Sequence, residues 1–206
     1  MSGPTPAFWQ ARFEAGNTPW DRGAPNPQLL HWLSQAGLNP ARLGPNLAVP
    51  GCGSGHEVAA LAGAGFSVTA LDYAPAAVAT TRERLAALGL RADVQLADVL
   101  HWLPPSPLDA VYEQTCLCAL HPDHWVAYAA QLHRWLRPQG RMFALFMQAP
   151  KPGAQEGRIE GPPYHGDVHA MRALFTGSQW QWPTPPFTQV PHPAGISELA
   201  LVLTRF

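Results

Sequence analysis

Charged residues are scarce in this chain: of its 206 residues, only 13% are Asp, Glu, Lys or Arg. The 14 acidic and 13 basic side chains leave a net charge of −1, so the sequence lacks the basic surface that a non-specific nucleic-acid or acidic-membrane binder needs. Only three cysteines occur, and an odd number argues against a disulfide framework. No apolar run reaches the length of a membrane span, and the N-terminus does not read as a signal peptide. We therefore expect a cytoplasmic, reduced protein without nucleic-acid or membrane partners.

Hydrophobic residues, by contrast, make up 47% of the chain, which at this length is enough to bury a sizeable core. We expect a single domain over residues 1–206. The 23 prolines cluster in a few stretches, and this clustering predicts long irregular loops. The stretch 149–163 is rich in both proline and glycine, so we expect it to form a lid on the substrate side.

Strand-like and helix-like segments alternate along the chain. Strands are expected at residues 46–50, 66–71, 93–96, 108–112, 141–147 and 198–206. Helices are expected at residues 56–65, 75–89, 123–136 and 167–175. This alternation predicts a doubly wound α/β sheet with helices on both faces.

A glycine-rich turn follows the first expected strand. Gly51, Gly53 and Gly55 lie between that strand and the first helix, where a doubly wound sheet binds its ligand and the backbone can approach it closely. Asp72 ends the second strand, where a carboxylate can accept hydrogen bonds from both ribose hydroxyls. Asp98 ends the third, where an adenine amino group would lie. The alternative is a turn that only connects strand to helix, with Asp72 capping the next helix.

The loop discriminates between nucleoside ligands. A dinucleotide-binding loop needs a third glycine at the position of His56, and the sequence has no clear cradle for a pyrophosphate. S-adenosylmethionine (SAM) carries no phosphate and tolerates a looser loop. The residues therefore favour SAM over a nicotinamide cofactor.

Several motifs carry a resemblance to a known family. FWQARFEAGNTPWDRG is similar to a W-x3-W-x-x-G-x-TPWD-x-G opening, with Phe13 in place of the second Trp. PGCGSGHEV, LDYA, YEQTCLCALHPDHW and GPPYH match further segments. Together they resemble the thiopurine S-methyltransferase family of class I SAM-dependent methyltransferases, especially its thiol, thiocyanate and halide branch. The resemblance implies a Rossmann-like, seven-stranded sheet and an N-terminal aromatic lid over the cofactor in residues 1–30.

The resemblance also implies site residues. The rings of the lid would cover the sulfonium, which aromatic faces attract, although these rings can alternatively pack on the sheet alone. Gln114 takes a cofactor-contacting position that is Tyr or Arg in relatives, and Asp21 and Arg22 can pair with each other on the surface. The expected cofactor-binding residues are Trp9, Phe13, Trp20, Gly51, Gly53, Asp72, Tyr73, Asp98, Val99 and Gln114. The expected substrate-binding residues are Trp20, Glu113, Tyr164 and His165.

The expected reaction is in-line transfer of a methyl group from SAM to a small soft nucleophile: a thiol, sulfide, thiocyanate or halide. Such an acceptor needs no dedicated base, so we expect no catalytic side chain. Cys116 and Cys118 are spaced too closely for paired zinc ligands, so we expect no metal and read both as small core residues on a continued strand. Alternatives are an acceptor that is a heterocyclic thiol, such as a thiopurine, or a small oxygen or nitrogen nucleophile. A non-catalytic protein that senses SAM is a further alternative. We expect a monomer or a homodimer.

Overall fold

A mixed sheet forms the centre of the molecule. The computed structural model describes residues 3–35, 37–192 and 195–206. Within them, eight strands form one sheet in the order β3-β2-β1-β4-β5-β8-β6, and β7 pairs with β8. The strands are β1 (Asn46–Pro50), β2 (Ser67–Asp72), β3 (Asp93–Leu96), β4 (Leu108–Gln114), β5 (Leu136–Gln148), β6 (Trp180–Gln181), β7 (Thr188–Pro191) and β8 (Ser197–Arg205). The first five are parallel, whereas β8 runs antiparallel to β5.

This sheet confirms the predicted doubly wound α/β class. It contains two strands, β6 and β7, beyond the six that the sequence pattern predicts. Its main path has seven strands, the number that the family resemblance implies, and β7 lies outside that path. β6 and β7 were not predicted, because β6 has two residues and β7 ends in Pro191, so neither shows a strand period. β5 begins five residues earlier than expected, because Leu136 pairs with Leu108 across a register shift.

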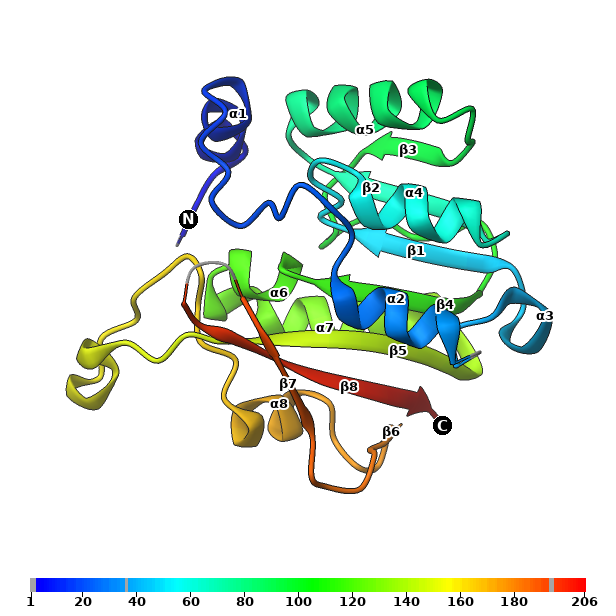
Figure 1. The fold of residues 1–206 in the computed structure, drawn as a ribbon. Helices are drawn as coiled ribbons and strands as arrows, with labels where there is room; N and C mark the ends of the chain where they lie inside the picture. The colour runs from blue at the N-terminus through cyan, green and yellow to red at the C-terminus, as the bar shows by residue number, and fades with distance from the viewer. Residues whose placement is uncertain (1–2, 36, 193–194) are drawn as a thin grey trace.

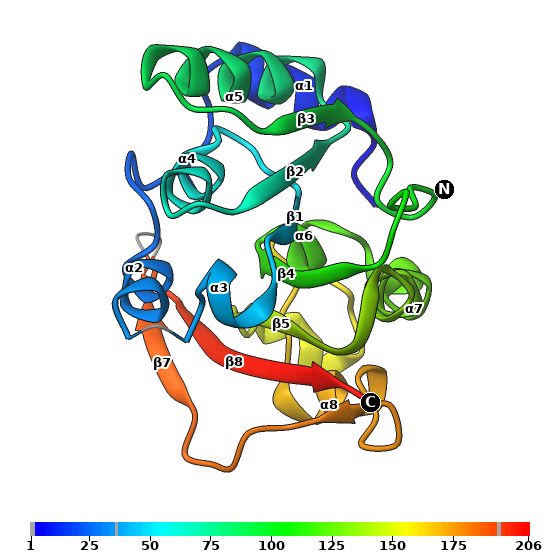
Figure 2. The same ribbon diagram turned by 90° about the vertical axis from the view of Figure 1, so that its right-hand side faces the viewer.

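Helices cover both faces of the sheet (Figures 1 and 2). They are α1 (Pro6–Glu14), α2 (Pro27–Ser34), α3 (Pro40–Leu43), α4 (His56–Gly63), α5 (Pro75–Ala87), α6 (Cys116–Ala119), α7 (Trp125–Trp135) and α8 (Val168–Leu174), with short 3-10 turns η1 (Pro122–His124) and η2 (Pro152–Glu156). No helix in the described ranges is long and apolar enough to cross a membrane.

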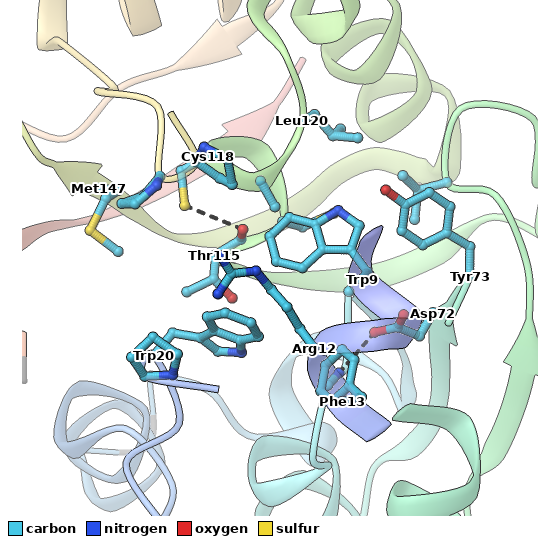
Figure 3. Close-up of a pocket in the computed structure, with 18 of the residues that line it drawn as sticks. Trp9, Arg12, Phe13, Trp20, Asp72, Tyr73, Thr115, Cys118, Leu120 and Met147 are labelled. Atoms are coloured by element: carbon cyan, nitrogen blue, oxygen red, sulfur yellow. Dashed lines mark hydrogen bonds between the residues drawn. The ribbon is translucent and has the colours of Figure 1, made fainter. Parts of the chain in front are cut away.

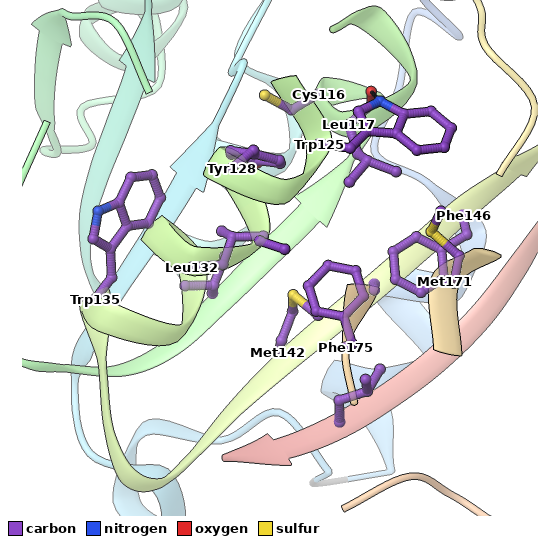
Figure 4. Packing of buried hydrophobic residues seen from close by; sticks show 14 of the residues in the cluster. Cys116, Leu117, Trp125, Tyr128, Leu132, Trp135, Met142, Phe146, Met171 and Phe175 are labelled. Carbon is purple, nitrogen blue, oxygen red and sulfur yellow. Dashed lines mark hydrogen bonds between the residues drawn. The ribbon is translucent and has the colours of Figure 1, made fainter. Parts of the chain in front are cut away.

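Two hydrophobic cores lie on the two faces. Along β5, Met142, Ala144 and Phe146 belong to one core and Phe143 and Leu145 to the other, as the two-residue period of a strand requires. The first core includes α7 and α8, and Figure 4 shows their buried side chains packed over β5. The second core lies beneath α2, α4 and α5. Burial of both faces explains why these strands lack a polar alternation.

The N-terminal segment lies across the end of the sheet. α1 packs beside α5, at the edge where β1, β2 and β4 end (Figure 1). The side chain of Gln10 accepts a hydrogen bond from the amide of Ala76 in the first turn of α5 (2.9 Å). This bond supplies a partner to a helix N-terminus whose own cap residue, Ala74, makes no side-chain bond. α1 is therefore attached to the body of the domain where a lid was expected.

Candidate active site

A cavity of about 390 Å³ lies between α1 and the carboxyl ends of the parallel strands (Figure 3). Its β2 side is formed by Gly53, Asp72, Tyr73, Asp98 and Val99. Its β5 side is formed by Cys118, Met147, Lys151, Pro162, Pro163 and Ile196. Trp9, Arg12, Phe13 and Trp20 from the N-terminal segment also line it.

The glycine loop turns tightly beside this cavity. Gly51 and Gly53 adopt positive φ angles of 61° and 53°. A Cβ atom at Gly51 would lie 3.1 Å from the Cβ of Cys116, and one at Gly55 would lie 2.7 Å from the Oγ1 of Thr81. The hydroxyl of Thr81 also donates to the Gly53 carbonyl (2.9 Å). The loop therefore needs glycine for its backbone angles and for close packing.

Asp72 connects this loop to the end of β2. One carboxylate oxygen accepts from the Gly53 amide (3.0 Å) and the other from the Ala74 amide (3.0 Å). Burial raises the pKa of Asp72, and the amides of Ala74 and Gly53 offset part of that increase. Its carboxylate is thus oriented by the backbone while it lines the cavity, as acceptance from ribose hydroxyls requires.

Asp98 and Val99 follow β3 and lie at the same side of the cavity. The carboxylate of Asp98 accepts from the Leu100 amide (2.9 Å) and lies 2.8 Å from Nδ1 of His101. Val99 is buried with 8% of its surface exposed. A half-exposed acid beside an apolar wall suits the edge and the face of a purine.

The lid consists of rings packed edge to face. The Trp20 ring lies 5.4 Å from the Trp9 ring and 6.0 Å from the Phe13 ring, at 80° and 78°. Sequence reasoning missed Arg12, which lies between the two predicted lid positions on α1. Its guanidinium lies 4.7 Å from the Phe8 ring centroid and 6.0 Å from that of Trp20.

The segment after Trp20 is attached differently from the expected surface pair. Arg22 does not pair with Asp21: its Nη2 lies 3.1 Å from Oε2 of Glu198 in β8 and donates to the Pro191 carbonyl (2.8 Å). Asp21 instead accepts from the Gly23 amide (2.7 Å) and lies 3.1 Å from Nε2 of His56. The two residues that directly follow the lid tryptophan, Asp21 and Arg22, therefore have separate partners.

Four of the expected site residues are absent from the described lining of the main cavity. Glu113 is buried and accepts from the Leu117 amide (2.7 Å), because β4 runs two residues further than predicted and then turns into α6. Burial raises the pKa of Glu113 to about 7. Tyr164 packs against the His121 ring (5.4 Å), and His165 accepts from the Ala149 amide (3.2 Å).

The fourth, Gln114, lines a smaller polar recess beside the main cavity. Its amide donates to Oε1 of Glu198 (3.0 Å) and accepts from the hydroxyl of Tyr112 (2.7 Å). The other nine expected cofactor-binding residues all line the main cavity: Trp9, Phe13, Trp20, Gly51, Gly53, Asp72, Tyr73, Asp98 and Val99.

The residues of the β5 side were mostly not predicted. Lys151 is the only lysine of the chain, and this rarity together with its position in the proline-rich loop was the available signal. Cys116 and Cys118 are buried as expected, but they lie in α6 rather than on a continued strand. Burial raises the pKa of Cys118 well above its usual value, and its thiol donates to the Thr115 carbonyl (3.3 Å). The part of the chain that the structure describes contains no group of three His, Cys, Asp or Glu residues placed to hold a metal.

Comparisons with known proteins agree with this geometry. Residues 4–184 match the thiopurine S-methyltransferase family. The probable thiol methyltransferase 2 of Arabidopsis thaliana is 29% identical over 170 residues, 82% of this chain and 71% of that protein. The thiopurine S-methyltransferase of Azotobacter vinelandii is 27% identical over 195 residues, 84% of this chain and 83% of that protein.

Solved structures show the same fold. The magnesium protoporphyrin IX methyltransferase of Synechocystis with bound SAH superposes with a TM-score of 0.71 at 17% identity, over 98% of this chain and 99% of that one. A protein described for the conversion of a disulfide bond into a thioacetal group in echinomycin biosynthesis superposes with a TM-score of 0.76 at 24% identity, over 98% and 93%. With the family match across most of its length, the chain belongs to the thiopurine S-methyltransferase family and is a SAM-dependent methyltransferase.

Proposed function

We propose that this methyltransferase transfers the methyl group of SAM to a small soft nucleophile, which is a thiol, sulfide, thiocyanate or halide, by in-line displacement. The observation that carries the proposal is the composition of the β5 side of the cavity. Apolar and sulfur-containing side chains form it, and a single lysine, Lys151, supplies the cation. An apolar wall strips water from a soft anion, and one nearby ammonium group attracts it.

The residues on the β2 side fit the cofactor. The glycine turn leaves its backbone open to the cavity, Asp72 is an oriented acceptor, and three aromatic rings close the space above. We propose that the nine residues of the β2 side, the glycine loop and the lid named above hold SAM. When bound, SAM supplies an electrophilic methyl group on a positively charged sulfur.

The arrangement of strands separates cofactor from acceptor. Asp72 ends β2 and Asp98 follows β3, whereas Met147 and Lys151 lie near and beyond the end of β5, on the opposite side of β1 and β4. An acceptor on the β5 side would therefore face the cofactor across the end of β4. Holding the two reactants in this way can lower the barrier by several kcal/mol.

The β5 side has no carboxylate base. Its described lining contains neither Asp nor Glu. The imidazole of His192 also lines the cavity, and burial together with the charge of Arg22 lowers its pKa, which favours the neutral form that can accept a proton. The proposed acceptors ionise in solution or carry a reactive lone pair, so they require no base in the transfer step.

The volume of the cavity favours a small acceptor. A cavity of about 390 Å³ is near the lower end of the range for drug-sized ligands, and the cofactor itself occupies much of it. A bicyclic thiopurine would need more of this volume than a thiocyanate or a hydrosulfide.

The test is an acceptor panel with isotopically labelled SAM: a small thiol, sulfide, thiocyanate, iodide, 6-mercaptopurine and a phenol. We expect kcat/KM for the best small soft nucleophile to exceed that for the thiopurine and for the phenol by at least about 10-fold, because the pocket accommodates the small acceptor better than either ring compound. Faster methylation of 6-mercaptopurine or of the phenol would contradict the proposal.

A further inference from the structure

Arg12 brings a positive charge to the main cavity that no acid of the protein balances. It lies on α1, one turn after Phe8, and lines the cavity beside the Trp20 ring. Figure 3 shows its side chain extended from α1 into the cavity. The residue is only partly buried, so a ligand in the cavity can reach it. Its guanidinium makes no hydrogen bond and no ion pair with any described residue.

The contacts that Arg12 does make leave its hydrogen-bond donors available. Its guanidinium carbon lies 4.7 Å from the centroid of the Phe8 ring and 6.0 Å from that of the Trp20 ring. Ring faces attract the charge of a guanidinium, but they do not replace oxygen acceptors for its N–H groups. The two rings therefore hold the group in place without saturating it. A planar guanidinium can donate two parallel hydrogen bonds to a carboxylate.

The permanent charges of the cavity are divided between its walls. Both acids of the described lining, Asp72 and Asp98, lie on the β2 side and accept from backbone amides. Both permanent cations, Arg12 and Lys151, come from α1 and from the loop after β5, and neither pairs with a described acid. SAM itself carries a net positive charge, so two further cations around it are unfavourable unless another ligand supplies negative charge. The acceptor is the ligand that can supply it.

We propose that Arg12 binds a carboxylate on the acceptor, so that the preferred acceptor is a small thiol that also carries a carboxylate. This rests on the proposed function and names one class within its soft nucleophiles. Lys151 attracts the thiolate, and Arg12 holds the other end of the molecule. A halide, a hydrosulfide or a thiocyanate carries a single charge and leaves one of the two cations without a partner.

The carboxylate takes no part in the bond changes. The thiol loses its proton to solvent, and a lone pair of the thiolate forms the new bond to the methyl carbon. The electron pair of the broken sulfonium bond stays on the sulfur of the cofactor. Arg12 is thus a specificity-determining residue that orients the acceptor for in-line attack.

The carboxylate of the cofactor is the competing partner for Arg12. If Arg12 bound that group, Arg12→Gln would weaken the binding of S-adenosylhomocysteine and leave the choice among acceptors unchanged. If Arg12 binds the acceptor, the variant changes the choice among acceptors and leaves this affinity unchanged. Acceptor preference and cofactor affinity therefore have to be measured in the same variants.

The test compares 3-mercaptopropionate with 1-propanethiol, which has the same chain length but no carboxylate, using isotopically labelled SAM. In the unaltered protein, kcat/KM calculated per thiolate should be at least about 10-fold greater for 3-mercaptopropionate, as a charge-assisted hydrogen bond would provide. Arg12→Gln should reduce this ratio to less than about 2, and Arg12→Lys, which keeps the charge but not the planar fork, should retain an intermediate ratio. The affinity for S-adenosylhomocysteine, measured by calorimetry, should change by less than about 2-fold in both variants.

Arg172→Gln is the matched control. The guanidinium of Arg172 lies 4.6 Å from the centroid of the Trp182 ring, outside the described cavity lining, so this variant also removes a ring-bound arginine. It should leave the ratio of the two thiols unchanged. A decrease of the ratio in Arg172→Gln equal to that in Arg12→Gln would overturn the assignment.

Three further results would overturn it. One is a ratio near 1 in the unaltered protein, and this result does not depend on the folding of any variant. The second is an undiminished ratio in Arg12→Gln. The third is a selective loss of S-adenosylhomocysteine affinity in that variant, which would assign Arg12 to the cofactor. Methylation of iodide and thiocyanate with a thiol ratio near 1 would overturn this inference alone, whereas methylation of a phenol and of no soft nucleophile would overturn the proposed function as well.

Discussion

Replacing Trp20 by alanine tests whether the N-terminal rings act on the cofactor or only pack together. Trp20 lies edge to face against Trp9 and Phe13, and it lines both the main cavity and the recess. Two functions are therefore possible for the same ring. It can stabilise the fold of the lid through its neighbours, and it can attract the positive sulfur of SAM.

The two functions predict different magnitudes. Each edge-to-face contact contributes about 0.5–1.5 kcal/mol, so Trp20→Ala should lower the free energy of unfolding by about 1–3 kcal/mol. The cation–π term of about 0.5–2 kcal/mol is available to SAM alone, because S-adenosylhomocysteine has a neutral sulfur. At about 1.4 kcal/mol for each factor of ten, SAM should lose about 2- to 30-fold more affinity than S-adenosylhomocysteine.

The assay is calorimetry with both ligands, together with melting curves and turnover. We expect turnover to fall as well, because the lid keeps water from the acceptor. Trp182→Ala is the matched control: Trp182 packs against Phe187 and donates to the Phe175 carbonyl, away from the described cavity lining. It should lose melting temperature without changing the ratio of the two affinities. Equal losses for SAM and S-adenosylhomocysteine in Trp20→Ala would refute the cation–π reasoning.

Four further outcomes are expected. Asp72→Ala should weaken S-adenosylhomocysteine binding by about 1–3 kcal/mol, and unchanged affinity in a folded variant would remove Asp72 from the site. Gln10→Ala should speed hydrogen exchange of the amides of α1 but not of α8, because the bond to Ala76 is lost. Burial holds the pKa of Glu113 at about 7 against 4.5, so the native state binds more protons between these values and stability falls as pH rises from 5 to 8. In Glu113→Gln, this decrease in the free energy of unfolding between pH 5 and pH 8, measured by urea unfolding, should be smaller by up to about 3 kcal/mol. An identical decrease in the variant would refute the assignment. Lys151→Gln should lower kcat/KM for thiocyanate about 5-fold and weaken its salt dependence, whereas an unchanged salt response would exclude Lys151 as the attracting charge.

The alternation of elements made most of the fold predictable, and some missed helices were also signalled. Thr5, Asn26 and Asn39 each precede a proline, and each side chain caps the helix that follows, α1, α2 and α3. A capping residue before a proline at the first helical position is a known helix start. The sequence therefore carries a start signal for each of these three helices. β6 and β7 carry no comparable signal, since their pairing with β8 alone defines them.

The β2 side of the cavity was predictable because the strand order places its residues together. Residues that end neighbouring parallel strands must meet at one edge, so Gly51, Asp72 and Asp98 come together wherever the strands pair in this order. Arg22 and Glu198 are separated by 176 positions, and no local pattern predicts their contact. The burial of Glu113 was not predicted, because β4 runs on to Gln114 and Thr115, with a positive φ of 64°, joins it directly to α6, whose Leu117 amide donates to the carboxylate.

The β5 side of the cavity, where we propose that the acceptor binds, is formed largely by loop residues. Met147 is the penultimate residue of β5, but Lys151 and Pro162 come from the loop that follows the strand, and Ile196 lies just before β8. Loop positions tolerate substitution without cost to the sheet, so the acceptor wall can vary while the cofactor wall stays fixed. On the proposed assignment, exchanges in 149–163 and at Ile196 would alter the acceptor wall without altering the cofactor wall. Exchanging Lys151 for a neutral residue changes the charge presented to the acceptor while leaving Asp72 and the glycine loop in place.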